Sequence, residues 1–156
     1  MSYTFSEALV ELITALIGTL GFALIFRVKG KHLPVVAVGG MLTDLFYLLS
    51  MLAGAGMLLA AVLASLFMGL YSEICARTLK APVAVFLLPC AIPIVPGSYL
   101  YYTMFHLLAQ DGEKFRLFLF GTLEIGVGIA LGTSIATVCV GLSLYLRERL
   151  KKKKNP

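Results

Sequence analysis

The chain has 156 residues, of which 60% are hydrophobic and only 13% are charged, and its formal net charge is +5. A soluble domain carries about 25% charged residues. This composition excludes an ordinary soluble protein and predicts an all-α, polytopic membrane protein. We expect residues 1–156 to form a single integral membrane domain, because the apolar runs leave no room for a separate soluble domain.

Apolar runs of about 20 residues predict helices that cross a membrane. Five such runs are expected, from about Ala8 to Phe26, Pro34 to Leu52, Met57 to Ala76, Ala81 to Ala109, and Phe115 to Leu146. Four crossings are the alternative, if the second and third runs merge or if the fourth re-enters the membrane without crossing it.

The placement of basic residues favours five crossings. The C-terminal segment 147–156 carries two arginines and four consecutive lysines after the last apolar run. Such a tail marks a cytoplasmic end and attracts anionic lipid, so we expect no nucleic-acid partner. Five crossings then place the basic clusters at 27–31 and 77–80 in the cytoplasm as well, and the N-terminus outside.

The fourth run is broken between Pro89 and Gly97, where Pro89, Pro93 and Pro96 follow one another within eight residues. Each proline lacks an N–H and clashes with the carbonyl four residues earlier. A broken helix within a membrane is tolerated only where protein or a water-filled cavity receives the freed backbone groups. Transporters build substrate sites in this way. The alternative is a structural kink packed against neighbouring helices.

The predicted substrate site begins at this break. Ser98 is the expected N-cap of the second half-helix, whose N–H groups favour an anionic group. The carbonyls of Val85, Pro89 and Ile92 are expected to lack their usual helical partners and to accept bonds from an ammonium, a hydroxyl or a cation. The predicted substrate-binding residues are Pro93, Pro96, Gly97, Ser98 and Tyr101.

Two acids fall within predicted spans, Asp44 in the second and Glu124 in the last. An ionisable group in a membrane is a functional hypothesis by default, because burying its charge is unfavourable. We expect Asp44 and Glu124 to carry a proton or to pair with a coupling cation. The alternative for Glu124 is contact with water near the outer interface. Glu73 is expected to pair with Arg77 at i,i+4 in a structural role.

Small residues recur at fourfold spacing in the last and third spans, at Gly128, Gly132 and Ala136 and at Ala61, Ser65 and Gly69. Such faces let helix backbones approach closely. They pack either against each other within the chain or against another subunit. Their extent favours another subunit, and self-association into a homo-oligomer is open.

The sequence predicts no enzyme, cofactor or metal site. Three cysteines and two histidines are scattered along the chain without metal-ligand spacing. The glycine pairs lie within apolar spans rather than after a strand, so they do not form a phosphate loop.

The proline-rich segment resembles a known family. Three stretches are similar to the signature of the small subunit of the threonine/serine exporter family: Leu79-Lys80-Ala81-Pro82, Leu87-Leu88-Pro89, and Ile92 to Ser98. Tyr101 falls where the family has a tyrosine, and Gly21 to Arg27 resembles the family's first helix and its basic exit. The residue after that tyrosine is often basic in the family, whereas this chain has Tyr102.

The resemblance implies a secondary exporter of small amino acids, or of dicarboxylates such as succinate, in the inner or plasma membrane of a bacterium. It also implies a larger membrane subunit as the partner and a small anionic or zwitterionic substrate. We expect proton coupling through a membrane acid. Two alternatives are a non-transporting scaffold subunit and a channel formed by self-association.

Overall fold

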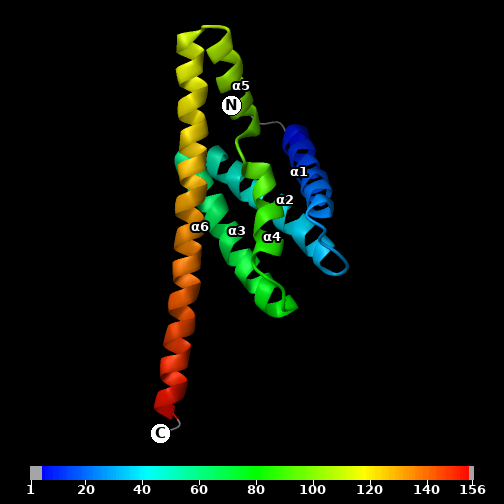
Figure 1. Cartoon of the computed structure of the whole chain (residues 1–156), viewed down its shortest axis with the longest axis vertical. Coiled ribbons are helices and arrows are strands. Elements are labelled where there is room, and N and C mark those ends of the chain that lie inside the picture. The colour runs from blue at the N-terminus through cyan, green and yellow to red at the C-terminus, as the bar shows by residue number, and fades with distance from the viewer. Residues whose placement is uncertain (1–4, 155–156) are drawn as a thin grey trace.

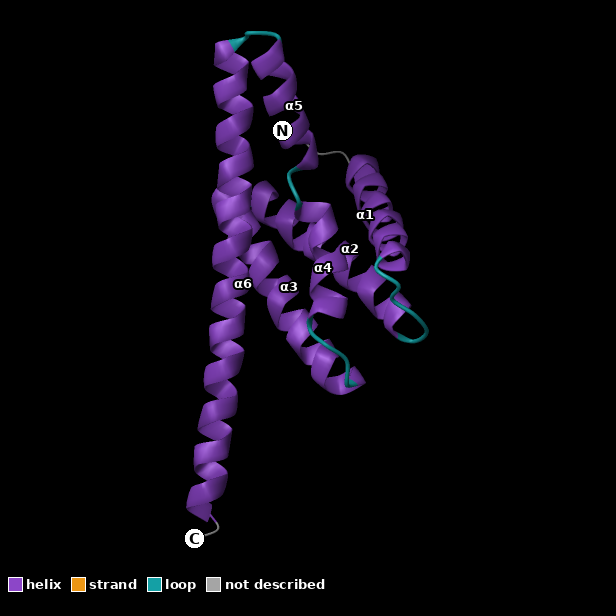
Figure 2. Ribbon diagram, in the orientation of Figure 1, coloured by secondary structure: helices purple, strands orange, loops and turns teal. Residues whose placement is uncertain are grey.

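The structure is a computed structural model that describes residues 5–154, and over this range it consists of helices joined by short loops (Figures 1 and 2). The elements in chain order are α1 (Phe5–Ile25), α2 (His32–Leu52), α3 (Met57–Leu79), α4 (Ala84–Ala91), the 3₁₀ turn η1 (Ile92–Ile94), α5 (Gly97–Leu108) and α6 (Gly112–Lys154). The all-α prediction is therefore confirmed.

The predicted spans correspond to the observed helices. α1, α2, α3 and α6 are each long and apolar enough to cross a membrane, and α4–η1 with α5 forms a fifth candidate that is bent by 54°. The last helix is longer than predicted. Its 43 residues rise about 65 Å, about twice the thickness of a hydrocarbon core. The basic segment from residue 147 onward continues α6 as far as Lys154.

The molecule has two parts along its length (Figure 1). α1 to α4 lie beside the middle of α6, whereas α5 and the first turns of α6 form a hairpin that extends beyond them. The α1–α2 loop, the α3–α4 connection and the C-terminal end of α6 all lie toward the opposite end from this hairpin (Figure 1). The two basic connections thus lie on the side of α1 to α4 away from the hairpin, and the C-terminal end of α6 projects past them in the same direction (Figure 1).

The largest helix interface joins α3 to α6. Added methyl groups at Gly128 and Gly132 would collide with the α3 backbone at Leu58 O and Val62 O. The Ser65 hydroxyl donates to Ala61 O at 2.6 Å within α3, and its oxygen lies 3.1 Å from Gly128 O across the interface. The small-residue faces thus pack against each other within the chain. These residues therefore give no indication of another subunit, because the chain itself fills this contact.

A second core holds α4 against α2 and α3. Phe86 and Cys90 of α4 are fully buried with Met68 of α3 and Val36 of α2. The Tyr71 hydroxyl donates to Val35 O at 2.7 Å and ties α3 to the start of α2. This packing fixes α4, and so it places the turn that follows α4 against α1 and α2.

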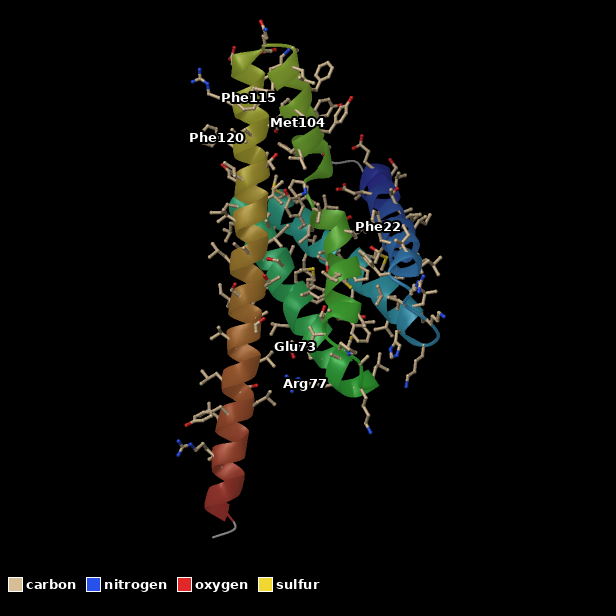
Figure 3. All side chains as sticks on the ribbon, viewed as in Figure 1. Phe22, Glu73, Arg77, Met104, Phe115 and Phe120 are labelled. Carbon is tan, nitrogen blue, oxygen red and sulfur yellow. The ribbon has the colours of Figure 1, made fainter. Side chains whose placement is uncertain are left out.

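Charged side chains stabilise the ends of two helices. Arg77 donates to Glu73 at 2.9 Å near the end of α3, as predicted (Figure 3). Asp111 caps α6, since its Oδ1 accepts from the Lys114 backbone N–H at 3.2 Å. That bond, supported by the Lys114 ammonium, lowers the pKa of Asp111 below its ordinary value. Gln110, in the turn between α5 and α6, has a left-handed backbone with φ +55°.

Candidate functional site

The break in the fourth span is narrower than predicted. α4 continues through Pro89 without interruption and passes into η1. The helical path ends at Val95, which is extended with φ −64° and ψ 126°. The following Pro96 explains this conformation, because a residue before proline is disfavoured in the helical region. The break therefore lies at Val95 and Pro96 rather than across Pro89–Gly97.

The backbone carbonyls before the break keep hydrogen-bond partners. Pro89 O accepts from the Ile92 N–H, and Ile92 O accepts from the Val95 N–H at 3.3 Å. These are the tighter i to i+3 bonds of a 3₁₀ turn. The expectation that Pro89 and Ile92 carry free carbonyls is wrong, because the turn tightens instead of opening.

The start of α5 also differs from expectation. α5 begins at Gly97 with Pro96 as its N-cap residue, and no side chain makes a capping bond there. Ser98 lies within the first turn, so its prediction as the N-cap is wrong. The Gly97 N–H donates to Val95 O at 2.7 Å. Gly97 and Ser98 are both exposed.

A pocket of about 350 Å³ lies between α1, α2 and η1. It brings together two of the predicted site residues, Asp44 from α2 and Pro93 from η1. The other lining residues all come from α1, apart from one further residue of η1: Glu11, Thr14, Ala15, Gly18, Thr19 and Ile92. We call this cavity the α1–α2–η1 pocket.

Asp44 is the most unusual side chain of this pocket. It is only 5% exposed, and its Oδ2 has no hydrogen-bond partner within the described residues. A buried, unpaired carboxylate oxygen is unfavourable unless a ligand or a proton satisfies it. Asp44 is held in place because Gly40, one turn earlier, approaches Thr19 of α1 so closely that no side chain fits between them. The helix crossing thus places a carboxyl beside the broken span.

Glu11 is the residue that the sequence analysis missed. It lines the same pocket as Asp44 and acts on it electrostatically. A signal for it exists in the sequence, because Glu11, Thr14, Ala15 and Gly18 follow the i, i+3, i+4, i+7 spacing of one helix face. This face is polar within an otherwise apolar span, which is the mark of a face turned toward a cavity or a partner.

The remaining predicted residues lie away from the pocket. Pro96, Gly97 and Ser98 lie at the break but do not line it. Tyr101 is 64% exposed on α5, and its ring centroid is 5.3 Å from that of Tyr102. The described structure does not bring Tyr101 to Asp44.

Glu124 lies in a different cavity. It is exposed on α6 and lines a hollow of about 450 Å³ with Tyr99, Phe118 and Met57. Figure 3 labels Phe115 and Phe120 on this part of α6, opposite Met104 of α5. The two membrane acids, Asp44 and Glu124, therefore belong to separate sites in the chain as described.

A further hollow, of about 830 Å³, is a groove between α2 and α3. Its lining is almost entirely apolar, with the rings of Phe46 and Phe67 stacked at 4.2 Å between centroids. It offers no charged side chain to a substrate. The smaller α1–α2–η1 pocket is the candidate site, because it combines the broken span with a buried carboxyl.

Comparison with known families decides the class of protein. The family described as "Threonine/Serine exporter, ThrE" matches residues 11–139. The chain belongs to the threonine/serine exporter family. This match runs from Glu11 through the broken span and most of α6, so it contains the whole α1–α2–η1 pocket. Searches of curated proteins and of solved structures returned no match. Membership and the apolar helices together identify a membrane transport protein of the exporter type.

Proposed function

We propose that this chain is one component of a secondary-active exporter that moves small amino acids such as threonine and serine, or dicarboxylates such as succinate, across a bacterial cell membrane. The observation that carries the proposal is the buried carboxyl of Asp44 beside the broken span, in a chain of the exporter family. The lengths of the apolar helices support a multi-pass protein.

In this proposal the break has a mechanical role. The 54° bend between α4–η1 and α5 allows the two halves of the span to tilt separately, as alternating access requires. Substrate passes along Pro93, Pro96, Gly97, Ser98 and Tyr101, and Asp44 and Glu124 exchange the driving protons. Because Tyr101 and Glu124 lie outside the α1–α2–η1 pocket, the path extends from that pocket along α5.

The proposal includes a larger partner subunit and an orientation. α5 packs mainly on α6, and the side chains of Leu100, Tyr101 and Phe105 are each more than half exposed. A partner in the membrane that covers this face would complete the path. The basic connections lie on the side away from the α5–α6 hairpin, and the end of α6 extends further in that direction, which supports a cytoplasmic C-terminus and an outer N-terminus.

Replacing Pro96 tests the role of the break. Pro96→Ala removes the restriction on Val95, so α4 and α5 can join into a straighter helix. We expect export of labelled threonine, serine and succinate from cells to fall at least tenfold for whichever is transported, with normal amounts of protein in the membrane. The matched control is Pro82→Ala, which alters an exposed proline before α4.

Unchanged export by Pro96→Ala, with the partner still bound, would contradict a role of the break in transport. It would favour the scaffold interpretation. Export that only equalises concentrations and survives a protonophore would instead favour a passive channel formed by self-association.

A further inference from the structure

The polar side chains that line the α1–α2–η1 pocket present only acceptors to it when their carboxyls are ionised. Thr14 donates its hydroxyl hydrogen to Val10 O, and Thr19 donates to Ala15 O, each at 2.7 Å. Both hydroxyl hydrogens are therefore used within α1, and the oxygens keep free lone pairs. Glu11 and Asp44 add two carboxylates.

No lining residue supplies a positive charge to balance these carboxylates. The lining contains no Lys, Arg or His, and Pro93 lacks a backbone N–H. The nearest cationic cluster in sequence, at 27–31, lies in the α1–α2 loop. That loop precedes α2, and Asp44 follows the first residue of α2 by twelve positions, or about 18 Å of helix. The charge of this pocket is left for a ligand to neutralise.

Asp44 is a second, independent indication of a ligand. It is 5% exposed, it lines the pocket, and its Oδ2 has no hydrogen-bond partner within the described chain. Thr43, its neighbour, is equally buried but donates to Gly39 O at 2.8 Å. Of these two neighbours, only Asp44, which faces the pocket, lacks a hydrogen-bond partner.

We propose that the α1–α2–η1 pocket binds a monovalent cation, either an alkali metal ion or a primary ammonium group, between the carboxylates of Glu11 and Asp44 with the Thr14 and Thr19 oxygens beside them. A water occupies about 30 Å³, so 350 Å³ accommodates a partly hydrated ion or an ammonium group carried by a small molecule. Two carboxylates in so open a pocket do not form the compact oxygen shell that Ca²⁺ requires.

The proposal extends the proposed function. Cation binding itself does not depend on that function, but the role given to the cation does. An alkali ion in this pocket would be a coupling ion, and an ammonium group would belong to the transported molecule. In either case protonation of a carboxyl removes negative charge that attracts the cation, so proton binding and cation binding compete. Such competition is what an exchanger needs at its coupling site.

Direct binding tests the site. The full chain, purified in lipid nanodiscs, is titrated with radiolabelled sodium ion and with radiolabelled methylammonium, at constant ionic strength set by N-methyl-D-glucamine. We expect saturable binding of at least one probe. Asp44→Asn and Glu11→Gln should each weaken it at least tenfold. The matched control is Glu113→Gln, an acid-to-amide change at an exposed position on the first turn of α6.

The two probes separate the two sources of the cation. Binding of sodium alone identifies an inorganic ion, and binding of methylammonium alone identifies an ammonium-bearing molecule. Binding of neither probe, or equal binding by Asp44→Asn, Glu11→Gln and the unaltered chain, overturns the site. If magnesium displaces both probes at a concentration lower than that at which either probe binds, the assignment of a monovalent cation is overturned.

Two measurements keep the result interpretable. The thermal unfolding midpoint of each variant checks folding, and Glu11→Gln provides a second variant at a less buried position if Asp44→Asn is unstable. Counterflow of labelled threonine is measured on the same preparations with the partner present. Counterflow without cation binding would contradict the cation site but support the exporter function. Cation binding without counterflow of any candidate substrate would support the site but contradict the exporter function.

Discussion

The α3–α6 and α1–α2 crossings both depend on glycines that let the helices approach closely, but they differ in what lies beside the contact. At the α3–α6 interface, Gly128 and Gly132 let the backbones approach, and the buried Ser65 hydroxyl donates to Ala61 O within α3 and lies 3.1 Å from Gly128 O. At the α1–α2 crossing, Gly40 approaches Thr19 equally closely. Beside that contact, however, lies a pocket with an unpaired carboxylate oxygen of Asp44.

The difference shows that one helix interface of this protein serves stability, whereas another borders a candidate binding site. The α3–α6 interface has several small residues in register over two or more turns, so the helices close along their length. At the α1–α2 crossing, the close approach of Gly40 to Thr19 lies beside the α1–α2–η1 pocket. This pocket leaves space for a ligand. Close packing is stabilising, and incomplete packing beside it provides the site.

The largest expected change in stability comes from a substitution that disrupts the α3–α6 interface. Gly132→Leu forces a branched side chain against the Ser65 hydroxyl and the α3 backbone at Val62 and Leu66. We expect it to destabilise the chain by about 3 kcal/mol or more, because overpacking against backbone cannot be relieved by side-chain rotation. Unfolding in mixed micelles, followed by circular dichroism, measures the change.

The control for this change lies on the same helix. Gly126→Leu adds the same side chain where an added methyl group meets nothing within 4 Å. It should leave stability equal or slightly higher, since leucine is the better helix former. Equal destabilisation by the two variants would show that α6 does not pack on α3 through the Gly132 face.

An intermediate effect is expected at the open crossing. Gly40→Ala places a methyl group against the hydroxyl and methyl of Thr19, which should destabilise by about 1–3 kcal/mol. It should also weaken cation binding more than tenfold, because α1 and its Glu11 move away from Asp44. Equilibrium binding and unfolding of the same variant are compared with Gly21→Ala, whose added methyl group meets nothing within 4 Å.

Truncating Thr19 to alanine in the Gly40→Ala background should restore part of the stability. The double variant removes two of the three atoms that the new methyl group meets, and so it reports the contact directly. If the double variant is no more stable than Gly40→Ala alone, the assigned contact between α1 and α2 is incorrect.

The smallest expected change in stability comes from a substitution outside both helix crossings, which serves as a reference for the two. Gln110 joins α5 to α6 with φ +55°, a conformation that glycine adopts without strain. Gln110→Gly should therefore stabilise the chain by about 0.5–1 kcal/mol. Cation binding should be unchanged, since the turn is remote in sequence and contacts from the pocket. Gln110→Ala, which keeps a β-carbon, should give no gain in the same unfolding assay.

The candidate site could be predicted only in part. Pro93 and Asp44 were both recognised, one from its helix-breaking chemistry and the other from its charge within a span. Ser98 was misassigned as a cap because the residue before it, Gly97, already begins α5 after Pro96. The helix face of Glu11 is visible in the sequence, but its partner Asp44 lies 33 residues further along the chain (44 − 11). No local pattern shows that these two helix faces meet.

The amino-acid sequence by itself determined the membrane class, the approximate positions of the long helices and the presence of a broken span, because hydropathy and proline chemistry act over a few neighbouring residues. Tertiary structure alone decided where the polar faces point. It turned the small residues of α3 and α6 toward each other and brought Glu11 to Asp44, since helix crossings depend on contacts between residues far apart in the chain.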